Sequence, residues 1–283
     1  MVDKTSILLE ALPYIQKFYG KILVIKFGGS LLEEIELRDS ILRDLVLLKF
    51  IGIKPVVIHG GGSEISKEME KIGKKPEFVE GLRVTDEETI DIIHKSLGGK
   101  INKELVLVIQ KHGGSAIGIS GIDGNLVLAE RMSGERKELG YVGEVSKINP
   151  KIINYLLDED FIPVIASIGA DENGTSLNLN ADHVAAELAS AMKAEKLIFL
   201  TDVPGVLEDP EREDSLISTL NMGEAKELVE SETITEGMIP KVNSCLSSLK
   251  SGVNRTHIIN GKTPHALLLE LLTESGIGTM IGE

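Results

Sequence analysis

Short apolar runs alternate with amphipathic helical patterns along the chain. Apolar runs at 21–27, 55–59, 162–168, 196–201 and 256–260 predict strands, with a last strand ending near Ile281. Between them, apolar residues recur at helical spacing, which is typical of helices that bury one face. The sequence predicts helices near 35–50, 63–72, 86–97, 100–112, 150–159, 181–193 and 223–230, from Pro240 until Gly252, and at 264–273.

This alternation predicts an α/β fold, a three-layer αβα sandwich whose central sheet is mainly parallel, with helices on both faces. A β-rich middle interrupts the pattern at 115–119, 125–131 and 141–145. There, Asp123-Gly124-Asn125 and Gly140 favour hairpin turns. Thr85 is a candidate N-cap for the helix that follows it, with Glu88 three residues on.

The first twenty residues predict an amphipathic helix over 6–19, within which Pro13 would kink the helix or begin a second segment. We therefore divide the chain into an N-terminal helix, 1–20, and one domain, 21–283. The domain has two expected lobes, about 21–175 and about 176–283.

Composition narrows the function classes. The 283 residues are 42% hydrophobic and carry a net charge of −14, which argues against nucleic acid or an anionic membrane as the main partner. Cys245 is the only cysteine, so an internal disulfide is excluded and a reducing cytoplasm is expected. No apolar run approaches the roughly 20 residues that span a bilayer. The first residues do not form a signal peptide.

Two glycine turns carry the first chemical signal. Each follows an apolar strand and precedes a helical pattern: Lys26-Phe27-Gly28-Gly29-Ser30 and His59-Gly60-Gly61-Gly62-Ser63. Glycine exposes backbone N–H groups, and a helix start adds partial positive charge, so both turns favour anions. The Walker A pattern is absent. The sequence thus indicates phosphate chemistry on another scaffold; the alternative is that these are only tight strand-to-helix turns.

Two polar clusters suit a carboxylate ligand. Arg83, in Gly81-Leu82-Arg83-Val84-Thr85, could clamp a carboxylate with two hydrogen bonds, or form a surface salt bridge. Asn178-Leu179-Asn180-Ala181-Asp182 places two amides and a carboxylate at a helix start, where simple N-capping by Asn180 or Asp182 is the alternative reading.

Two further clusters suit a nucleotide or a phosphate. The segment from Asp202 to Leu207 follows a strand, where open α/β sheets bind ligands, although an ordinary turn would look the same. Lys241 falls in the first turn of a helix, where a cation opposes the helix dipole. An anion between this lysine and the helix N–H groups would explain the placement. The alternative is an exposed lysine whose unfavourable interaction with the helix dipole is screened by solvent, which requires no anion.

Taken together, these motifs resemble the amino acid kinase superfamily and, within it, the N-acetyl-L-glutamate kinases. The resemblance runs over nearly the whole chain, to Gly276-Ile277-Gly278-Thr279-Met280. It implies ATP-dependent phosphorylation of the γ-carboxylate of N-acetylglutamate, giving an acyl phosphate for arginine biosynthesis. ATP with Mg²⁺ is the implied cofactor, the metal arriving mainly with the nucleotide rather than in a protein cage.

The resemblance also implies roles for particular residues. In the catalytic set, Lys26 and Lys241 flank the transferring phosphoryl group, Asp182 pairs with both lysines, and Gly28 and Gly29 add backbone donors. Acceptor binding falls to the first lobe, through Gly61, Gly62, Arg83 and Asn178, with Gly61 also a donor. Nucleotide binding falls to the second lobe, through Asp202, Val203, Pro204, Gly205, Val206, Leu207, Thr233, Ile234 and Thr235.

A helix before the first strand resembles that of arginine-inhibited members, where it links dimers into a hexameric ring. The resemblance implies arginine as an effector, bound at Tyr14, Glu270 and Gly276. The alternative is a helix that packs only on its own subunit.

Other functions on the same fold stay open. The acceptor could be carrier-linked α-aminoadipate or glutamate, free glutamate, aspartate or UMP. A non-catalytic amino-acid sensor is a rival of another class, but it has no need of Lys26, Asp182 and Lys241 together.

Overall fold

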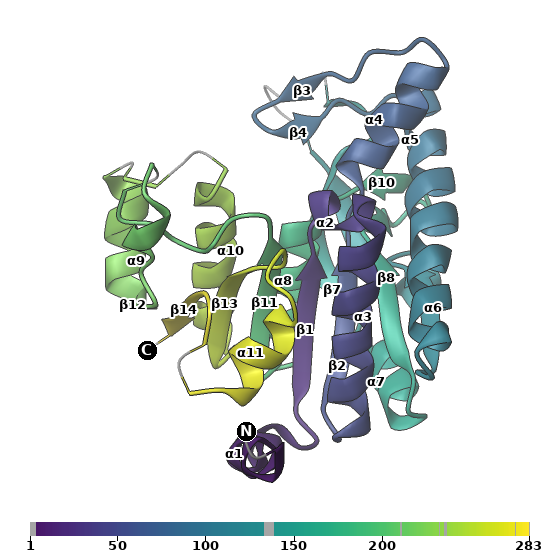
Figure 1. Ribbon diagram of the computed structural model, residues 1–283. Helices are drawn as coiled ribbons and strands as arrows, with labels where there is room; N and C mark the ends of the chain where they lie inside the picture. The colour runs from purple at the N-terminus through teal and green to yellow at the C-terminus, as the bar shows by residue number, and fades with distance from the viewer. Residues whose placement is uncertain are drawn as a thin grey trace.

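A central sheet between two helical layers dominates the computed structural model (Figure 1), which describes residues 4–132, 139–209, 211–231, 233–234, 237–274 and 276–282. The strand order is β12-β14-β13-β11-β1-β2-β8-β5, and neighbours run parallel except β13 and β14. The strands are β1 (Ile22–Phe27), β2 (Lys54–His59), β5 (Ala116–Ser120), β8 (Ile162–Ala166), β11 (Lys196–Thr201), β12 (Thr219–Asn221), β13 (Arg255–Asn260) and β14 (Thr279–Gly282).

The two faces of the sheet bury different helices because successive side chains of a strand point to opposite faces. On β1, Leu23 and Ile25 pack toward one layer and Val24 toward the other. The first layer holds α3 (Ile35–Phe50), α6 (Asn102–Lys111) and α11 (Ala266–Leu272); the second holds α7 (Lys151–Asp158), α8 (Ala181–Ala191) and α10 (Ile239–Lys250). The predicted three-layer αβα architecture is confirmed.

A second, four-stranded sheet has the order β10-β9-β6-β7. Its strands are β6 (Val127–Arg131), β7 (Gly143–Ile148), β9 (Ile168–Ala170) and β10 (Ser176–Asn178), and a separate hairpin, β3 (Phe78–Val79) with β4 (Leu82–Arg83), projects at the top of Figure 1.

The sequence predicted the β-rich middle but not its division between sheets. Segment 115–119 belongs to the central sheet as β5. The prediction of a hairpin turn at Asp123-Gly124-Asn125 was wrong: η2 (Asp123–Asn125) is a 3₁₀ turn that leads from β5 into β6 of the other sheet. Gly140, with φ 68°, does lie between the antiparallel neighbours β6 and β7.

The two helices predicted at 86–97 and 100–112 form one continuous run: α5 (Glu87–Ile93), the π-helix η1 (His94–Ile101) and α6. The predicted N-cap was wrong by one residue, because the carboxylate of Asp86 accepts the Thr89 N–H at 2.9 Å. Thr85 instead donates its hydroxyl to the Arg83 carbonyl.

Helix α1 (Lys4–Phe18) contains Pro13 without being divided by it, and lies below α11 in Figure 1. Its last residue, Phe18, is buried in the core, whereas Leu9 and Leu12 are 62% and 44% exposed. The remaining short helices are α2 (Gly29–Glu33), α4 (Gly62–Lys71), α9 (Met222–Glu230) and η4 (Glu213–Ser215). No helix of the described residues is long and apolar enough to cross a membrane.

Candidate active site

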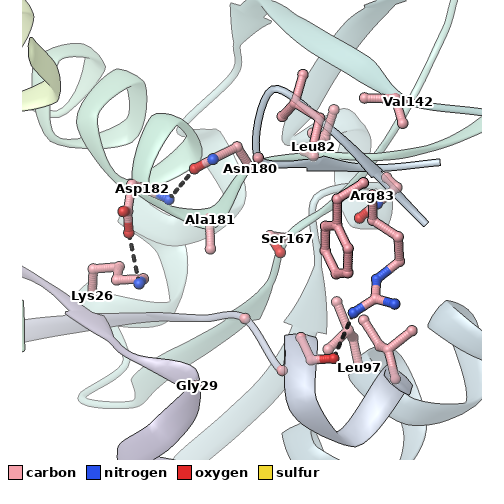
Figure 2. A pocket seen from close by; sticks show the side chains of 18 residues that line it. Lys26, Gly29, Leu82, Arg83, Leu97, Val142, Ser167, Asn180, Ala181 and Asp182 are labelled. Atoms are coloured by element: carbon pink, nitrogen blue, oxygen red, sulfur yellow. Dashed lines mark hydrogen bonds and ion pairs between the residues drawn. The ribbon is translucent and has the colours of Figure 1, made fainter. Parts of the chain in front are cut away.

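Lys26 and Lys241 meet at one carboxylate. Side-chain alternation on β1 turns Lys26 to the face that α8 and α10 cover, because it shares the parity of Val24. Its Nζ lies 2.6 Å from Asp182 Oδ1, and Lys241 Nζ, from the first turn of α10, lies 3.3 Å from Asp182 Oδ2. Figure 2 shows the pairing of Lys26 with Asp182. The structure thus brings together three residues that are far apart in sequence.

Asp182 is held in place by the start of α8. The Asn180 side chain caps this helix, accepting the backbone N–H of Asp182 at 2.8 Å and that of His183 at 3.2 Å. Of the two N-cap candidates, Asn180 and Asp182, Asn180 is the one that caps the helix. Burial alone would raise the pKa of Asp182, but the ammonium groups of Lys26 and Lys241 outweigh it and keep this pKa below its ordinary value. The site therefore carries an ionised bridge with two cations.

The two glycine turns lie side by side because β1 and β2 are adjacent and parallel, with Phe27 opposite His59. A Cβ built on Gly29 would lie 3.7 Å from the backbone nitrogen of Gly62. At Gly28 a Cβ would meet the Leu200 carbonyl oxygen at 2.8 Å, so only glycine fits there. The result is a wall of bare backbone beside Lys26.

Arg83 comes from β4 and faces the same cavity from the other side (Figure 2). Its Nη2 donates to the Gly62 carbonyl at 2.6 Å and to Ser66 Oγ at 2.8 Å. The Phe78 ring covers the guanidinium at 4.7 Å, as cation–π contacts do. Arg83 is 7% exposed, so the reading as a surface salt bridge was wrong.

Asn178, from the second sheet, also lines this cavity. Its backbone N–H donates to the Tyr141 carbonyl at 2.8 Å, and its Nδ2 donates to Thr85 Oγ1 at 3.1 Å. Its position in β10 therefore ties the second sheet to the segment that follows Arg83.

Together these groups enclose a cavity of about 240 Å³. Seven of the predicted site residues line the cavity. Lys241 does not line it but pairs with Asp182, which does. The apolar part of the wall was not predicted from the sequence; Phe78 and Leu82 could have been found, since they flank the Gly81 turn. The lining residues are Lys26, Gly29, Gly60, Gly61, Gly62, Ile65, Phe78, Gly81, Leu82, Arg83, Leu97, Val142, Ser167, Asn178, Leu179, Asn180, Ala181 and Asp182.

The candidate nucleotide segment begins at the same edge of the sheet. β11 is the other neighbour of β1, and the Gly28 N–H donates to the carbonyl of Leu200 at 3.1 Å. Beyond β11, Asp202 and Val203 are exposed, Pro204 and Leu207 are partly buried, and Gly205 and Val206 are buried. Thr233 is partly buried and Ile234 is buried; Thr235 lies outside the described residues.

Tyr14, Glu270 and Gly276 line a second cavity, of about 330 Å³, between α1 and α11. Glu270 Oε1 lies 2.6 Å from Nδ1 of His257, and Oε2 accepts the backbone N–H groups of Ile277 and Gly278. The structure therefore gathers the three predicted effector residues around one buried carboxylate.

The sequence matches the profile of the Amino acid kinase family over residues 21–260. The chain belongs to this family. It is 52% identical over 290 residues to a curated acetylglutamate kinase from Methanocaldococcus jannaschii, covering 99% of this chain and 97% of that one. It is also 52% identical over 285 residues to an acetylglutamate kinase from Methanothrix thermoacetophila, covering 99% of both chains.

A solved structure of N-acetylglutamate synthase from Neisseria gonorrhoeae, complexed with coenzyme A and N-acetyl-glutamate, is similar with a TM-score of 0.89 and 29% identity. The match covers 99% of this chain but spans 64% of the synthase. A second structure of that synthase, with coenzyme A and L-arginine, matches with a TM-score of 0.81 and 28% identity over 99% of this chain and 65% of that one.

Proposed function

We propose that this protein transfers the γ-phosphoryl group of ATP to the γ-carboxylate of N-acetyl-L-glutamate, the second step of arginine biosynthesis. The observation that carries the proposal is the cavity with a lysine–aspartate–lysine bridge at one end and Arg83 at the other. The near full-length relatives named acetylglutamate kinase support it.

The chemistry needs electrostatics rather than a base. A γ-carboxylate with an ordinary pKa near 4.3 is already ionised at pH 7, so it can attack phosphorus directly. The obstacle is the approach of two anions and the charge on the transferring group. Lys26 and Lys241 would stabilise that charge from two sides, and Asp182 would hold both ammonium groups in position. Backbone N–H groups of Gly29 and Gly61 would add donors. The Gly28 N–H, expected from the sequence to do the same, instead donates to the Leu200 carbonyl.

Arg83 would hold the acceptor by its α-carboxylate. Its contacts to the Gly62 carbonyl, Ser66 Oγ and Met69 Sδ fix the guanidinium plane and use three of the five N–H donors of an arginine, which leaves two to bind oxygen. Gly61, Gly62 and Asn178 would complete the acceptor site. These residues belong to the part of the domain that we assign to the acceptor, about 21–175, with Asn178 just beyond it.

The part from about 176 to 283 would bind the nucleotide, through residues 202–207 and 233–235. Its place next to Gly28 supports this assignment, because the phosphates would then reach the glycine turns. Mg²⁺ would arrive with the phosphates of ATP and neutralise part of their charge. Residence in a reducing cytoplasm would suit the single, buried Cys245.

Arginine is the effector that we propose for the second cavity, where Glu270 would receive its guanidinium. The matched synthase has been solved with L-arginine, which supports an arginine site on this fold. The exposed Leu9 and Leu12 of α1 support a dimer that assembles further into a hexamer through this helix. An arginine titration of the activity of wild type and Tyr14→Ala tests the effector site: a weaker response of the variant is expected, and an equal one would contradict it.

The function is tested by ADP release in a coupled assay with N-acetylglutamate, glutamate, aspartate, carrier-linked α-aminoadipate and UMP as acceptors. We expect turnover with N-acetylglutamate to exceed the others by orders of magnitude. Faster turnover with another acceptor would show that this acceptor, and not N-acetylglutamate, is the substrate. If no acceptor gave ADP release, the non-catalytic amino-acid sensor would be the better account.

A further inference from the structure

His59 is a buried histidine that phosphoryl transfer as described does not use. It ends β2 immediately before the glycine turn Gly60-Gly61-Gly62, and it is 0% exposed. Because its parity is that of Val57 and opposite to that of Ile58, its ring points toward the layer that contains α6. Burial lowers its pKa to about 4, so the ring is neutral at pH 7.

The ring has one tautomer that satisfies its neighbours. Nδ1 lies 3.0 Å from the Gly60 carbonyl oxygen, which can only accept, so Nδ1 carries the hydrogen. Nε2 lies 3.1 Å from Nδ2 of Asn102 and is then free to accept. The orientation of the Asn102 amide follows from its other contacts: Nδ2 is 3.1 Å from the Ile119 carbonyl and 3.0 Å from that of Val164, and Oδ1 accepts from Lys103. Nδ2 carries two hydrogens for three acceptors, so the His59 ring shares one of them with a strand carbonyl.

The Asn102 side chain is enclosed and hydrogen-bonded by the surrounding strands. It is 0% exposed at the junction of η1 and α6, and it reaches the carbonyls of two adjacent strands, β5 and β8. A Cβ on Gly118 would lie 1.9 Å from Asn102 Oδ1, so this position of β5 has room for Asn102 only because it is glycine. Asn102 therefore anchors the His59 ring to the rigid sheet.

The contact of the His59 ring with the Gly60 carbonyl determines the direction of the Gly61 N–H. The described chain contains no cis peptide bond, so the Gly60–Gly61 unit is trans, and its C=O and N–H point in opposite directions. The carbonyl is held by the buried ring. The N–H of Gly61 must then point away from the ring, and Gly60 and Gly61 both line the cavity. Leu97 and Ile101 of the π-helix pack so closely on Gly61 that a Cβ there would lie 2.6 and 2.3 Å from them.

We propose that His59, anchored by Asn102, is a positioning residue: its Nδ1–H fixes the Gly60–Gly61 peptide so that the Gly61 N–H serves as a donor to the transferring phosphoryl group. The proposal rests on the proposed function for the last step only. The orientation of the peptide and the tautomer of the ring stand independently of it.

The kinetic test compares His59→Leu, which removes both ring contacts, with His59→Asn, whose amide nitrogen can take the place of Nδ1. A small misplacement of a catalytic donor costs up to about 10²-fold, so His59→Leu should lower kcat by roughly 10- to 100-fold. The fold-loss in kcat should exceed any fold-rise in KM for N-acetylglutamate, which Gly61 also contacts in the proposed acceptor site. His59→Asn should recover at least a third of the loss in log kcat. Equal kcat for the two folded variants, or a loss confined to KM, would overturn the positioning role.

Two controls separate positioning from loss of fold. His112→Asn alters a histidine that pairs with Asp39, between α3 and the end of α6, and should leave kcat unchanged. Asn102→Ala should lower kcat as His59→Leu does, and the double variant should lose little more than either alone, since coupled residues are not additive. Fully additive losses would show that the two residues act separately and would contradict the proposal that Asn102 acts by anchoring His59.

A spectroscopic test needs no activity and no folded variant of His59→Leu. Magic-angle-spinning NMR of the [¹⁵N]histidine-labelled protein at pH 7 resolves protonated from bare ring nitrogens, and His59→Asn identifies the signals that belong to His59 among the six histidines. We expect a neutral ring with the hydrogen on Nδ1. A hydrogen on Nε2, or a charged ring, would overturn the proposal even if N-acetylglutamate is the substrate; a failed acceptor assay with the expected tautomer would overturn the function instead.

Discussion

Lys26 Nζ and Asp182 Oδ1 lie 2.6 Å apart, although β1 and α8, which supply them, are far apart in the sequence. Each side chain is 11% exposed, so little water screens the pair. The second oxygen of the same carboxylate faces Lys241. A single anion thus sets the spacing of two cations on which, in our account, the transition state depends.

Replacement of Asp182 by asparagine should therefore lower kcat by roughly 10²–10³-fold, the scale for loss of a preorganised charged or donor group. The amide leaves both ammonium groups without their counter-charge, so they repel each other and lose position. Glu187→Gln, a carboxylate removed from the same helix at a half-exposed position, is the matched control and should keep its kcat. Equal kcat for Asp182→Asn and Glu187→Gln would contradict the role of the bridge.

Replacement of Arg83 by alanine should raise KM for N-acetylglutamate by roughly 10- to 100-fold and spare KM for ATP, since loss of a hydrogen bond to a charged group costs about 1.5–3 kcal/mol. Arg83 faces the acceptor end of the cavity and contacts Gly62 and Ser66. Ser66→Ala removes one of these contacts while keeping the guanidinium, and should have a small effect. Steady-state kinetics with each substrate varied in turn decide the point; damage to both KM values would indicate a structural arginine.

Folding stability should depend on pH through His59. The folded pKa of His59 is about 4 and the unfolded value is near 6.5, so between these values the unfolded chain binds more protons. The contribution is complete above pH 6.5 and declines as the pH falls toward 4, by about 1.4 kcal/mol per unit. From pH 7.5 to 5, wild type should lose about 2 kcal/mol more free energy of unfolding than His59→Asn. Urea unfolding at equal protein concentration measures this; identical losses would show that His59 titrates normally.

The N-terminal helix offers a test of assembly. Removal of residues 1–20 would also remove Phe18, which is buried in the core, so deletion is a poor experiment. The exposed Leu9 and Leu12 allow a gentler one. Leu9→Glu with Leu12→Glu should convert a hexamer into dimers in light scattering and leave basal kcat intact, because buried glutamates would disrupt a helix–helix contact. Glu10→Gln on the same helix is the control. If the variant had the same mass in light scattering as the wild type, α1 would pack only on its own subunit.

Much of this molecule could be predicted from the sequence because local pattern and fold agree. A mainly parallel sheet was expected, and in such a sheet the turns that follow the strands lie at one edge. The sequence did not predict that the strands of the two glycine turns are neighbours, which the pairing of β1 with β2 shows. An N-cap at Asn180 or Asp182 was predicted from their place at the start of an alanine-rich helix, and the structure selects Asn180. Family likeness, rather than spacing, joined Lys26, Asp182 and Lys241 before the structure showed their contacts.

Other features depend on tertiary contacts that no local pattern contains. Strands β9 and β10 are three residues long, too short to give a periodic signal. Thr85 has the composition of an N-cap, yet its hydroxyl is taken by the Arg83 carbonyl and by Asn178. Asn102 looks like a surface residue of a helix, and only the missing side chain of Gly118, in a strand packed against it, gives it a buried place.

The central claim is that a phosphoryl group reaches the γ-carboxylate of N-acetyl-L-glutamate. An acyl phosphate reacts with hydroxylamine to give a hydroxamate and free phosphate, whereas a stable phosphate ester does not. We predict that protein, ATP, Mg²⁺, N-acetyl-L-glutamate and hydroxylamine together yield N-acetylglutamyl 5-hydroxamate by mass spectrometry, in amounts equal to the ADP released, and that Lys26→Ala yields roughly 10²-fold less or lower. ADP release by the wild type without the hydroxamate would contradict the account.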